Sequence, residues 1–67
     1  MIVVVVNGKE LAINNGATAE DLIKQLEYQH QRIALEVNEA IIPKSKHGEF
    51  LLNDGDQIEI IKAVGGG

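Results

Sequence analysis

The chain has 67 residues, no cysteine and a net charge of −4, and these three facts limit its chemistry. A chain this short supports one small core, so we expect residues 1–67 to form a single domain. The acidic balance argues against nucleic-acid binding, which requires clustered Lys and Arg, and favours protein partners with basic surfaces. The absence of cysteine excludes disulfides, thiolate nucleophiles and the commonest zinc sites.

The N-terminal apolar run is the part of the sequence closest to a membrane segment. It covers only Ile2 to Val6, far short of the length that spans a bilayer, and it has no basic leader or cleavage site. We therefore expect a cytoplasmic protein that does not bind membranes.

The first elements predicted are two strands joined by a tight turn. Ile2 to Val6 is β-branched throughout and apolar on both faces, which is typical of an interior strand. Asn7-Gly8 is the strongest short hairpin signal, and Lys9 to Ile13 is the predicted partner strand.

A short helix is predicted to follow Asn14-Asn15-Gly16. Thr18 is its expected N-cap, and Asp21 can complete a capping box. One apolar stripe at helical spacing should face the sheet, formed by Ala19, Leu22, Ile23 and Leu26. The helix is expected to end near Tyr28 after about three turns, because the apolar period stops there.

Two further strands are predicted after the helix. Ile33 to Val37 alternates apolar and polar residues, with Ala34 and Glu36 on the outward side. Asn38-Glu39 is the expected turn, and Ala40 to Ile42 is a brief strand that Pro43 stops.

The last third of the chain is expected to contain one more strand. Lys44 to Gly48 is predicted as a polar loop, and Glu49 to Leu52 as a short strand or turn. A tight turn over Asn53-Asp54-Gly55-Asp56 leads into the final strand, Gln57 to Ile61.

The predicted order is therefore β-β-α-β-β-β, an α+β fold with a mixed sheet and one helix on one of its faces. If the last strand runs parallel to the first, the crossover between them should be right-handed. The residues expected to face inward are Ile2, Val4, Val6, Leu11, Ile13, Leu22, Ile23, Leu26, Leu35, Val37, Ile41, Phe50, Leu52, Ile58 and Ile60.

Side chains suited to catalysis do not form a recognisable set. His30 and His47 lie in polar stretches without ligand-like spacing, so both are expected on the solvated surface. Ser45 and Thr18 have no neighbouring base, and no phosphate-binding glycine motif occurs. We therefore expect that the chain is not an enzyme and binds no metal.

Two features go beyond what folding requires. Val3, Val5 and Ile61 are expected to point away from the helix and to form a contiguous apolar patch, if the first and last strands are neighbours. The patch is interpreted as a partner site, although a loop or a dimer could cover it, or the residues could be scattered surface apolar groups.

The second feature is the glycine tail, Gly65 to Gly67, after the β-rich run. Glycine has no side chain, so such a tail is expected to be flexible and thin enough to enter an enzyme's narrow channel. The tail could equally be a frayed terminus without a role. If it has a role, its α-carboxylate is the group that a partner would activate, for example as an acyl-adenylate.

The chain resembles the ThiS-type sulfur carriers of thiamin (thiazole) biosynthesis, which have a ubiquitin-like β-grasp fold. The resemblance covers essentially the whole chain. It is carried by the opening strand, the helix Thr18 to Leu26, Val37-Asn38 with Ile41-Ile42-Pro43, and Asp54 to Ile61 followed by the terminal glycines.

The resemblance implies a carrier that other proteins act on. A ThiF-type adenylating enzyme would use ATP to convert the Gly67 carboxylate to an acyl-adenylate. Sulfur derived from cysteine through a desulfurase persulfide would then form a thiocarboxylate, which donates its sulfur to thiazole synthase. Gly66 is the second glycine of the pair, Gly65 adds flexibility, and no cofactor is bound by the carrier itself.

By analogy with ubiquitin-like folds, partner docking is assigned to Val3, Val5, Ile61, Ala63 and Val64. Three alternatives stay open. The chain could be a MoaD-type carrier of molybdopterin synthesis, an interaction module of toxin–antitoxin type with an idle tail, or a protein modifier joined through isopeptide bonds.

Overall fold

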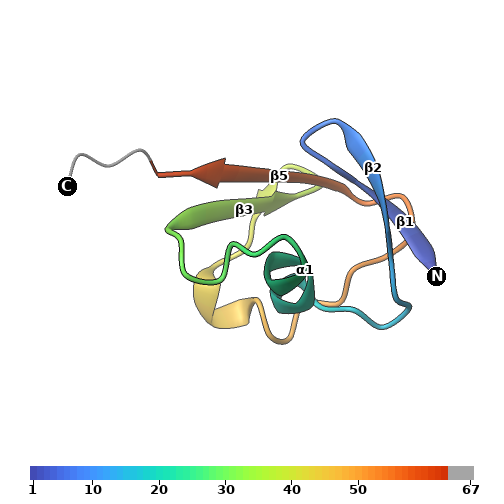
Figure 1. Ribbon diagram of the computed structural model, residues 1–67, viewed down its shortest axis with the longest axis horizontal. Helices are drawn as coiled ribbons and strands as arrows, with labels where there is room; N and C mark the ends of the chain where they lie inside the picture. Colours follow the sequence, from blue (N-terminus) through green and yellow to red (C-terminus); the bar gives the residue numbers. More distant parts are fainter. Residues whose placement is uncertain (64–67) are drawn as a thin grey trace.

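A computed structural model describes residues 1–63 as one mixed β-sheet with an α-helix on one side (Figure 1). The elements in chain order are β1 (Ile2–Val6), β2 (Lys9–Ile13), α1 (Ala19–Gln25), β3 (Ile33–Val37), β4 (Ala40–Ile41), the 3-10 helix η1 (Lys44–Lys46) and β5 (Gln57–Lys62). In the sheet the strands follow the order β2-β1-β5-β3-β4. β1 and β5 are parallel, whereas the other neighbouring pairs are antiparallel. The predicted α+β order with a mixed sheet is thus confirmed.

Two tight turns set the register of the outer strand pairs. Asn7 and Gly8 have φ values of 50° and 85°, and Asn38 and Glu39 have φ values of 51° and 71°. Two successive residues with positive φ form the turn whose twist matches that of an antiparallel strand pair. Each turn is therefore a two-residue hairpin connection, and a glutamate adopts the left-handed conformation in the second.

The helix begins as predicted and ends earlier. The Thr18 N–H donates to Asp21 Oδ2 at 2.9 Å, and the Asp21 N–H donates to Thr18 Oγ1 at 3.2 Å, which completes the capping box. At the other end Glu27 has a φ of 63°, and the Tyr28 N–H donates to the Ile23 carbonyl at 2.9 Å. This is a Schellman ending, in which a left-handed residue reverses the chain. The predicted third turn up to Tyr28 is wrong. Glu27 adopts the left-handed conformation that ends a helix, a position usually occupied by glycine, so the sequence contained no sign of this ending.

The segment between β3 and β5 differs from its prediction in two details. The 3-10 helix η1 occupies part of the predicted polar loop, and β4 is one residue shorter than expected. Residues 49–52, predicted as a short strand or turn, form no strand, and Leu51 makes an isolated bridge with Thr18. This bridge ties the segment to the start of α1 and places Leu52 beneath the helix.

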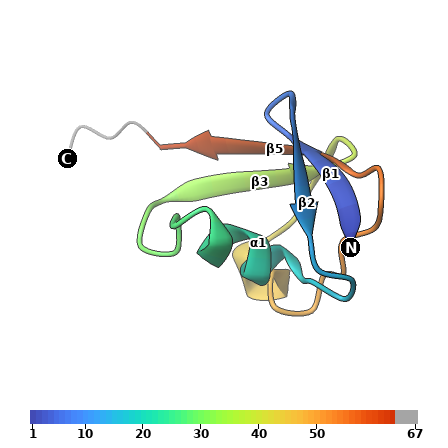
Figure 2. The same cartoon turned by 45° about the vertical axis from the view of Figure 1, so that its right-hand side comes forward.

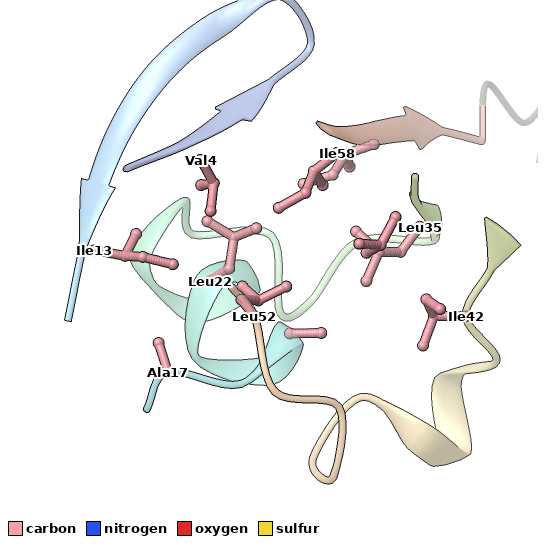
Figure 3. Close-up of a cluster of buried hydrophobic side chains, with 11 residues drawn as sticks. Val4, Ile13, Ala17, Leu22, Leu35, Ile42, Leu52 and Ile58 are labelled. Atoms are coloured by element: carbon pink, nitrogen blue, oxygen red, sulfur yellow. The ribbon is translucent and has the colours of Figure 1, made fainter. Parts of the chain in front are cut away.

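The core lies between α1 and the sheet, where Val4, Leu35 and Ile58 point toward Leu22 and Leu52 (Figure 3). The buried apolar residues are Val4, Ile13, Ala17, Ala19, Leu22, Ile23, Leu35, Val37, Ile42, Leu52, Ile58 and Ile60. The predicted residues Ile2, Val6, Leu11, Leu26 and Phe50 are partly buried against them.

The one clear error in the predicted core concerns neighbouring isoleucines. Ile41 is 72% exposed, whereas Ile42 is 8% exposed and belongs to the core. Side chains alternate between the two faces of a strand, so an error of one residue exchanges the inner and outer positions.

The helix packs on one face of the sheet only. Figures 1 and 2 agree that, among residues 1–63, no helix covers the opposite face of β3 and β5. That uncovered side is called the outward face below. Within the five strands its residues are Val3, Val5, Glu10, Ala12, Ala34, Glu36, Ile41, Gln57, Glu59 and Ile61.

Candidate functional site

β5 leads toward the glycine tail, and it is paired on both sides. It runs parallel to β1 and antiparallel to β3. The Ala63 N–H donates to the Arg32 carbonyl at 2.9 Å, so sheet-like pairing continues one residue beyond the strand. The predicted tail residues Gly65, Gly66 and Gly67, and the predicted docking residue Val64, lie outside the described residues.

Two asparagine side chains extend the pairing of β5 where its neighbours turn away. Asn7 Oδ1 accepts from the Ile60 N–H at 2.8 Å, and Asn7 Nδ2 donates to the Ile60 carbonyl at 3.2 Å. On the other edge, Asn38 Oδ1 accepts from the Gln57 N–H at 2.9 Å, and the Asn38 N–H donates to the Gln57 carbonyl at 2.7 Å. Both asparagines are turn residues, so the two turns also fix the strand that precedes the tail.

The Asp54-Gly55-Asp56 turn holds the beginning of β5. Asp54 Oδ1 accepts from the Val3 N–H at 2.8 Å, which joins this turn to β1. Asp56 is buried, and its carboxylate accepts from the Asn53 N–H at 2.8 Å and from Asn38 Nδ2 at 3.0 Å. These two carboxylates therefore serve the fold.

The end of β5 is anchored on the covered face. Lys62 Nζ lies 4.5 Å from the centroid of the Tyr28 ring, a cation–π contact worth about 0.5–1 kcal/mol at an exposed site. Because side chains alternate along a strand, Ile61 and Ala63 then face outward, and both are exposed.

The predicted docking residues share the outward face but do not form one patch. Val3 is 42% exposed, Ile61 is 52% exposed, and Val5 is half-buried. Val5 lies opposite Gln57, so Gln57 and Glu59 separate it from Ile61 along β5. The expected contiguous patch of Val3, Val5 and Ile61 is therefore not formed. The last two residues of β1 pair with the first two residues of β5, so Ile61 lies beyond the end of β1.

The structure places a different apolar residue on this face. Ile41 lies opposite Glu36, and Glu36 lies opposite Glu59, so the three form one row across β4, β3 and β5. The sequence contained a signal for this arrangement. A two-residue turn at Asn38-Glu39 pairs Glu36 with Ile41, and Glu36 was already predicted to face outward.

The two histidines occupy different environments. His30 is exposed, as predicted. His47 is only 7% exposed, and its Nε2 lies 3.0 Å from the Ile42 carbonyl. Because a carbonyl only accepts, Nε2 is the protonated nitrogen in this contact. The predicted surface position of His47 is wrong. His47 is the C-cap residue of η1, and its ring is buried against the Ile42 backbone.

Thr18, weighed as a nucleophile in the sequence, is occupied by helix capping. Hydrogen bonds from the Thr18 N–H and hydroxyl hold the pKa of the Asp21 carboxyl below its usual value, with the Lys24 charge contributing less.

Among residues 1–63, no group of three or more His, Asp or Glu side chains is placed to hold a metal ion. In the same part of the chain, no helix is long and apolar enough to span a membrane.

Comparison with known proteins gives consistent results. The model of the ThiS family matches residues 2–67. The sulfur carrier protein ThiS of Bacillus subtilis is 36% identical over 62 residues, which cover 91% of this chain and 94% of that protein. A thiazole synthase of Paramagnetospirillum magneticum is 38% identical over 63 residues, which cover 94% of this chain but 19% of that enzyme. The chain thus spans a small part of that relative.

A solved structure supports the fold independently. The crystal structure of the thiamine biosynthesis protein ThiS from Geobacter metallireducens superimposes with a TM-score of 0.83, over 98% of this chain and 100% of that one. The sequence identity is 23%, so this likeness concerns the fold, and it agrees with the predicted β-grasp architecture.

Proposed function

The chain belongs to the ThiS family of sulfur carriers, and from that premise we propose that it carries sulfur for thiazole formation in thiamin synthesis. The observation that supports this proposal most is the match of the family model through residue 67, which includes the glycines at the end of the sequence. In this proposal the chain is a substrate of other proteins and performs no catalysis itself.

The proposed chemistry takes place at the Gly67 carboxylate in two steps. A carboxylate oxygen attacks the α-phosphorus of ATP in a ThiF-type enzyme, and pyrophosphate leaves. Sulfide then attacks the carbonyl carbon of the acyl-adenylate, and AMP leaves with the bonding electrons, which gives a thiocarboxylate. The glycines matter because an enzyme can surround this carbon without meeting a side chain.

The described part of the chain supports the proposal through the way β5 is held. Asn7, Asn38 and the Tyr28–Lys62 contact fix the strand from its beginning to its last residue. Because β5 is already ordered in the free chain, a partner that binds next to it does not have to order this strand, and the conformational-entropy cost of binding is smaller.

Thiazole synthase is the proposed acceptor of the sulfur. Two thiazole synthases contain a segment similar to this chain, from Paramagnetospirillum magneticum and from Magnetococcus marinus. A carrier and an acceptor that occur in one polypeptide would meet at high effective concentration. We extend that association to the separate chain as part of the proposal.

The test is intact mass spectrometry after incubation with a ThiF-type enzyme, ATP and sulfide. We expect an ATP-dependent mass increase that corresponds to replacement of one oxygen by sulfur and maps to Gly67. The matched control lacks Gly66 and Gly67; it should keep the fold, by circular dichroism, and remain unmodified. If an enzyme that is active on its own carrier leaves this chain unchanged, the proposal fails. Modification by a MoaD-type activator alone would indicate the molybdopterin pathway instead.

A further inference from the structure

The sequence contains two Asn-Gly dipeptides, Asn7-Gly8 and Asn15-Gly16. In such a dipeptide the backbone nitrogen of the glycine can attack the side-chain amide carbon of the asparagine, which closes a five-membered succinimide ring. Glycine favours this reaction because it has no side chain that hinders the approach. The fold holds the two asparagines differently, so the two dipeptides should differ in reactivity.

The two glycines are closely matched. Gly8 has a φ of 85° and Gly16 a φ of 84°, and neither has a non-neighbouring atom within 4 Å of the position that a Cβ would occupy. All four residues of the two dipeptides are exposed. The difference between the dipeptides therefore lies in the asparagines.

The side chain of Asn7 is held away from this reaction. Its Oδ1 accepts from the Ile60 N–H at 2.8 Å, and its Nδ2 donates to the Ile60 carbonyl at 3.2 Å. Both ends of the amide are thus bound to β5. The side chain has to break both contacts before its amide carbon can turn toward the Gly8 nitrogen.

The side chain of Asn15 has no comparable restraint. Among residues 1–63, the asparagine side chains that form hydrogen bonds are those of Asn7 and Asn38. The loop that joins β2 to α1 contains Asn15 (Figure 2), in a turn that the Ala17 N–H closes by donating to the Asn14 carbonyl at 3.1 Å. The Gly16 N–H has no backbone acceptor in the described part of the chain, so its nitrogen is available as the nucleophile.

We propose that Asn15 is a site of spontaneous deamidation, and that the contact with Ile60 protects Asn7 from the same reaction. The Gly16 nitrogen forms a bond to Asn15 Cγ and gives up its proton, the bond between Cγ and Nδ2 breaks, and ammonia leaves. Water then adds to one of the two carbonyl carbons of the ring, and the bond from that carbon to the ring nitrogen breaks. Position 15 becomes aspartate or isoaspartate, depending on which carbonyl carbon the water attacks.

The isoaspartate product alters the turn that leads into α1. Its backbone runs through the former side chain, which adds one methylene group between Asn14 and Ala17. Ala17 is buried, its carbonyl accepts from the Leu52 N–H at 3.0 Å, and the next residue, Thr18, caps α1. A longer turn disturbs these contacts, so the isoaspartate form should be less stable than the unmodified chain. The aspartate form keeps the backbone length and should keep its stability.

The test is to incubate the folded full-length chain at mildly alkaline pH and to map deamidation by mass spectrometry after a short tryptic digestion. Lys9 lies between the two dipeptides, so trypsin separates them into different peptides. We expect deamidation at position 15 to be at least about tenfold faster than at position 7, where two hydrogen bonds must first break. Asn15→Gln, which would have to close a larger ring, should remove the fast reaction and keep the fold by circular dichroism.

The same chain in urea provides the control, because unfolding removes the contact between Asn7 and Ile60. There both positions should react at similar rates. Similar rates at both positions in the folded chain would refute the protection of Asn7. If position 15 reacts in urea but not in the folded chain, the proposed site is refuted. The separated isoaspartate form should unfold at a lower urea concentration than the unmodified chain, and equal midpoints would contradict the effect on the turn.

Discussion

The side chain of Asn7 pairs with the backbone of Ile60 through two hydrogen bonds, 53 residues apart in the sequence. Asn7 thereby continues the parallel pairing of β1 with β5 after β1 itself has ended. The contact joins a hairpin turn to β5, so a residue predicted only as part of a turn also holds the strand that precedes the glycine tail.

Removing the Asn7 side chain should loosen β5. Asn7→Gly preserves the positive φ and loses both hydrogen bonds to Ile60, so we expect a loss of about 1–3 kcal/mol in the free energy of unfolding. Amide hydrogen exchange at Ile60 should accelerate. Asn7→Asp keeps the acceptor for the Ile60 N–H but places a second acceptor oxygen against the Ile60 carbonyl, so it should also lose stability. Equal stability of Asn7→Gly and the wild type in urea would show that water replaces these contacts at no cost.

The capping carboxylate Asp21 should make stability depend on acid pH. Its pKa is lowered in the folded chain, so its contribution is complete above the unfolded pKa of about 3.9 and is lost as the pH falls through the folded pKa. Urea unfolding at neutral pH and at about pH 2 should therefore show a larger loss of stability for the wild type than for Asp21→Asn. Identical losses in both proteins would contradict the assignment.

The two histidines should respond differently to the same substitution. His47→Ala leaves the buried Ile42 carbonyl without its partner and should cost about 1–3 kcal/mol in the free energy of unfolding. His30→Ala, at an exposed position, should change stability by no more than about 0.5 kcal/mol. Thermal or urea denaturation of both variants measures the contrast, and equal effects would argue against the buried contact.

Adjacent isoleucines provide a test of the strand parity. Ile42→Ala removes a core side chain and should cost about 2–5 kcal/mol, whereas Ile41→Ala should change stability by no more than about 0.5 kcal/mol. Urea unfolding gives both values. A larger cost for Ile41→Ala would mean that the inward residue of this segment is the one originally predicted.

Local chemistry was sufficient for much of this protein. The Asn7-Gly8 turn, the Thr18–Asp21 capping box and the alternation in β1, β3 and β5 depend on residues close in sequence, so they could be predicted without the fold. The terminal glycines and the segment Asp54 to Ile61 were also sufficient to suggest the family that the comparisons now show.

Only the tertiary structure decided the rest, because each remaining feature depends on contacts between distant residues or on a shift of one position. The register of β5 against β1 separates Ile61 from Val5. The turn at Asn38-Glu39 pairs Ile41 with Glu36, and Glu36 in turn meets Glu59 across β3 and β5. The Asn38-Glu39 turn signals the pairing of Glu36 with Ile41 in the sequence, but the alignment of both with Glu59 depends on the register of β3 against β5, and a shift of one residue would move a side chain to the other face of the sheet.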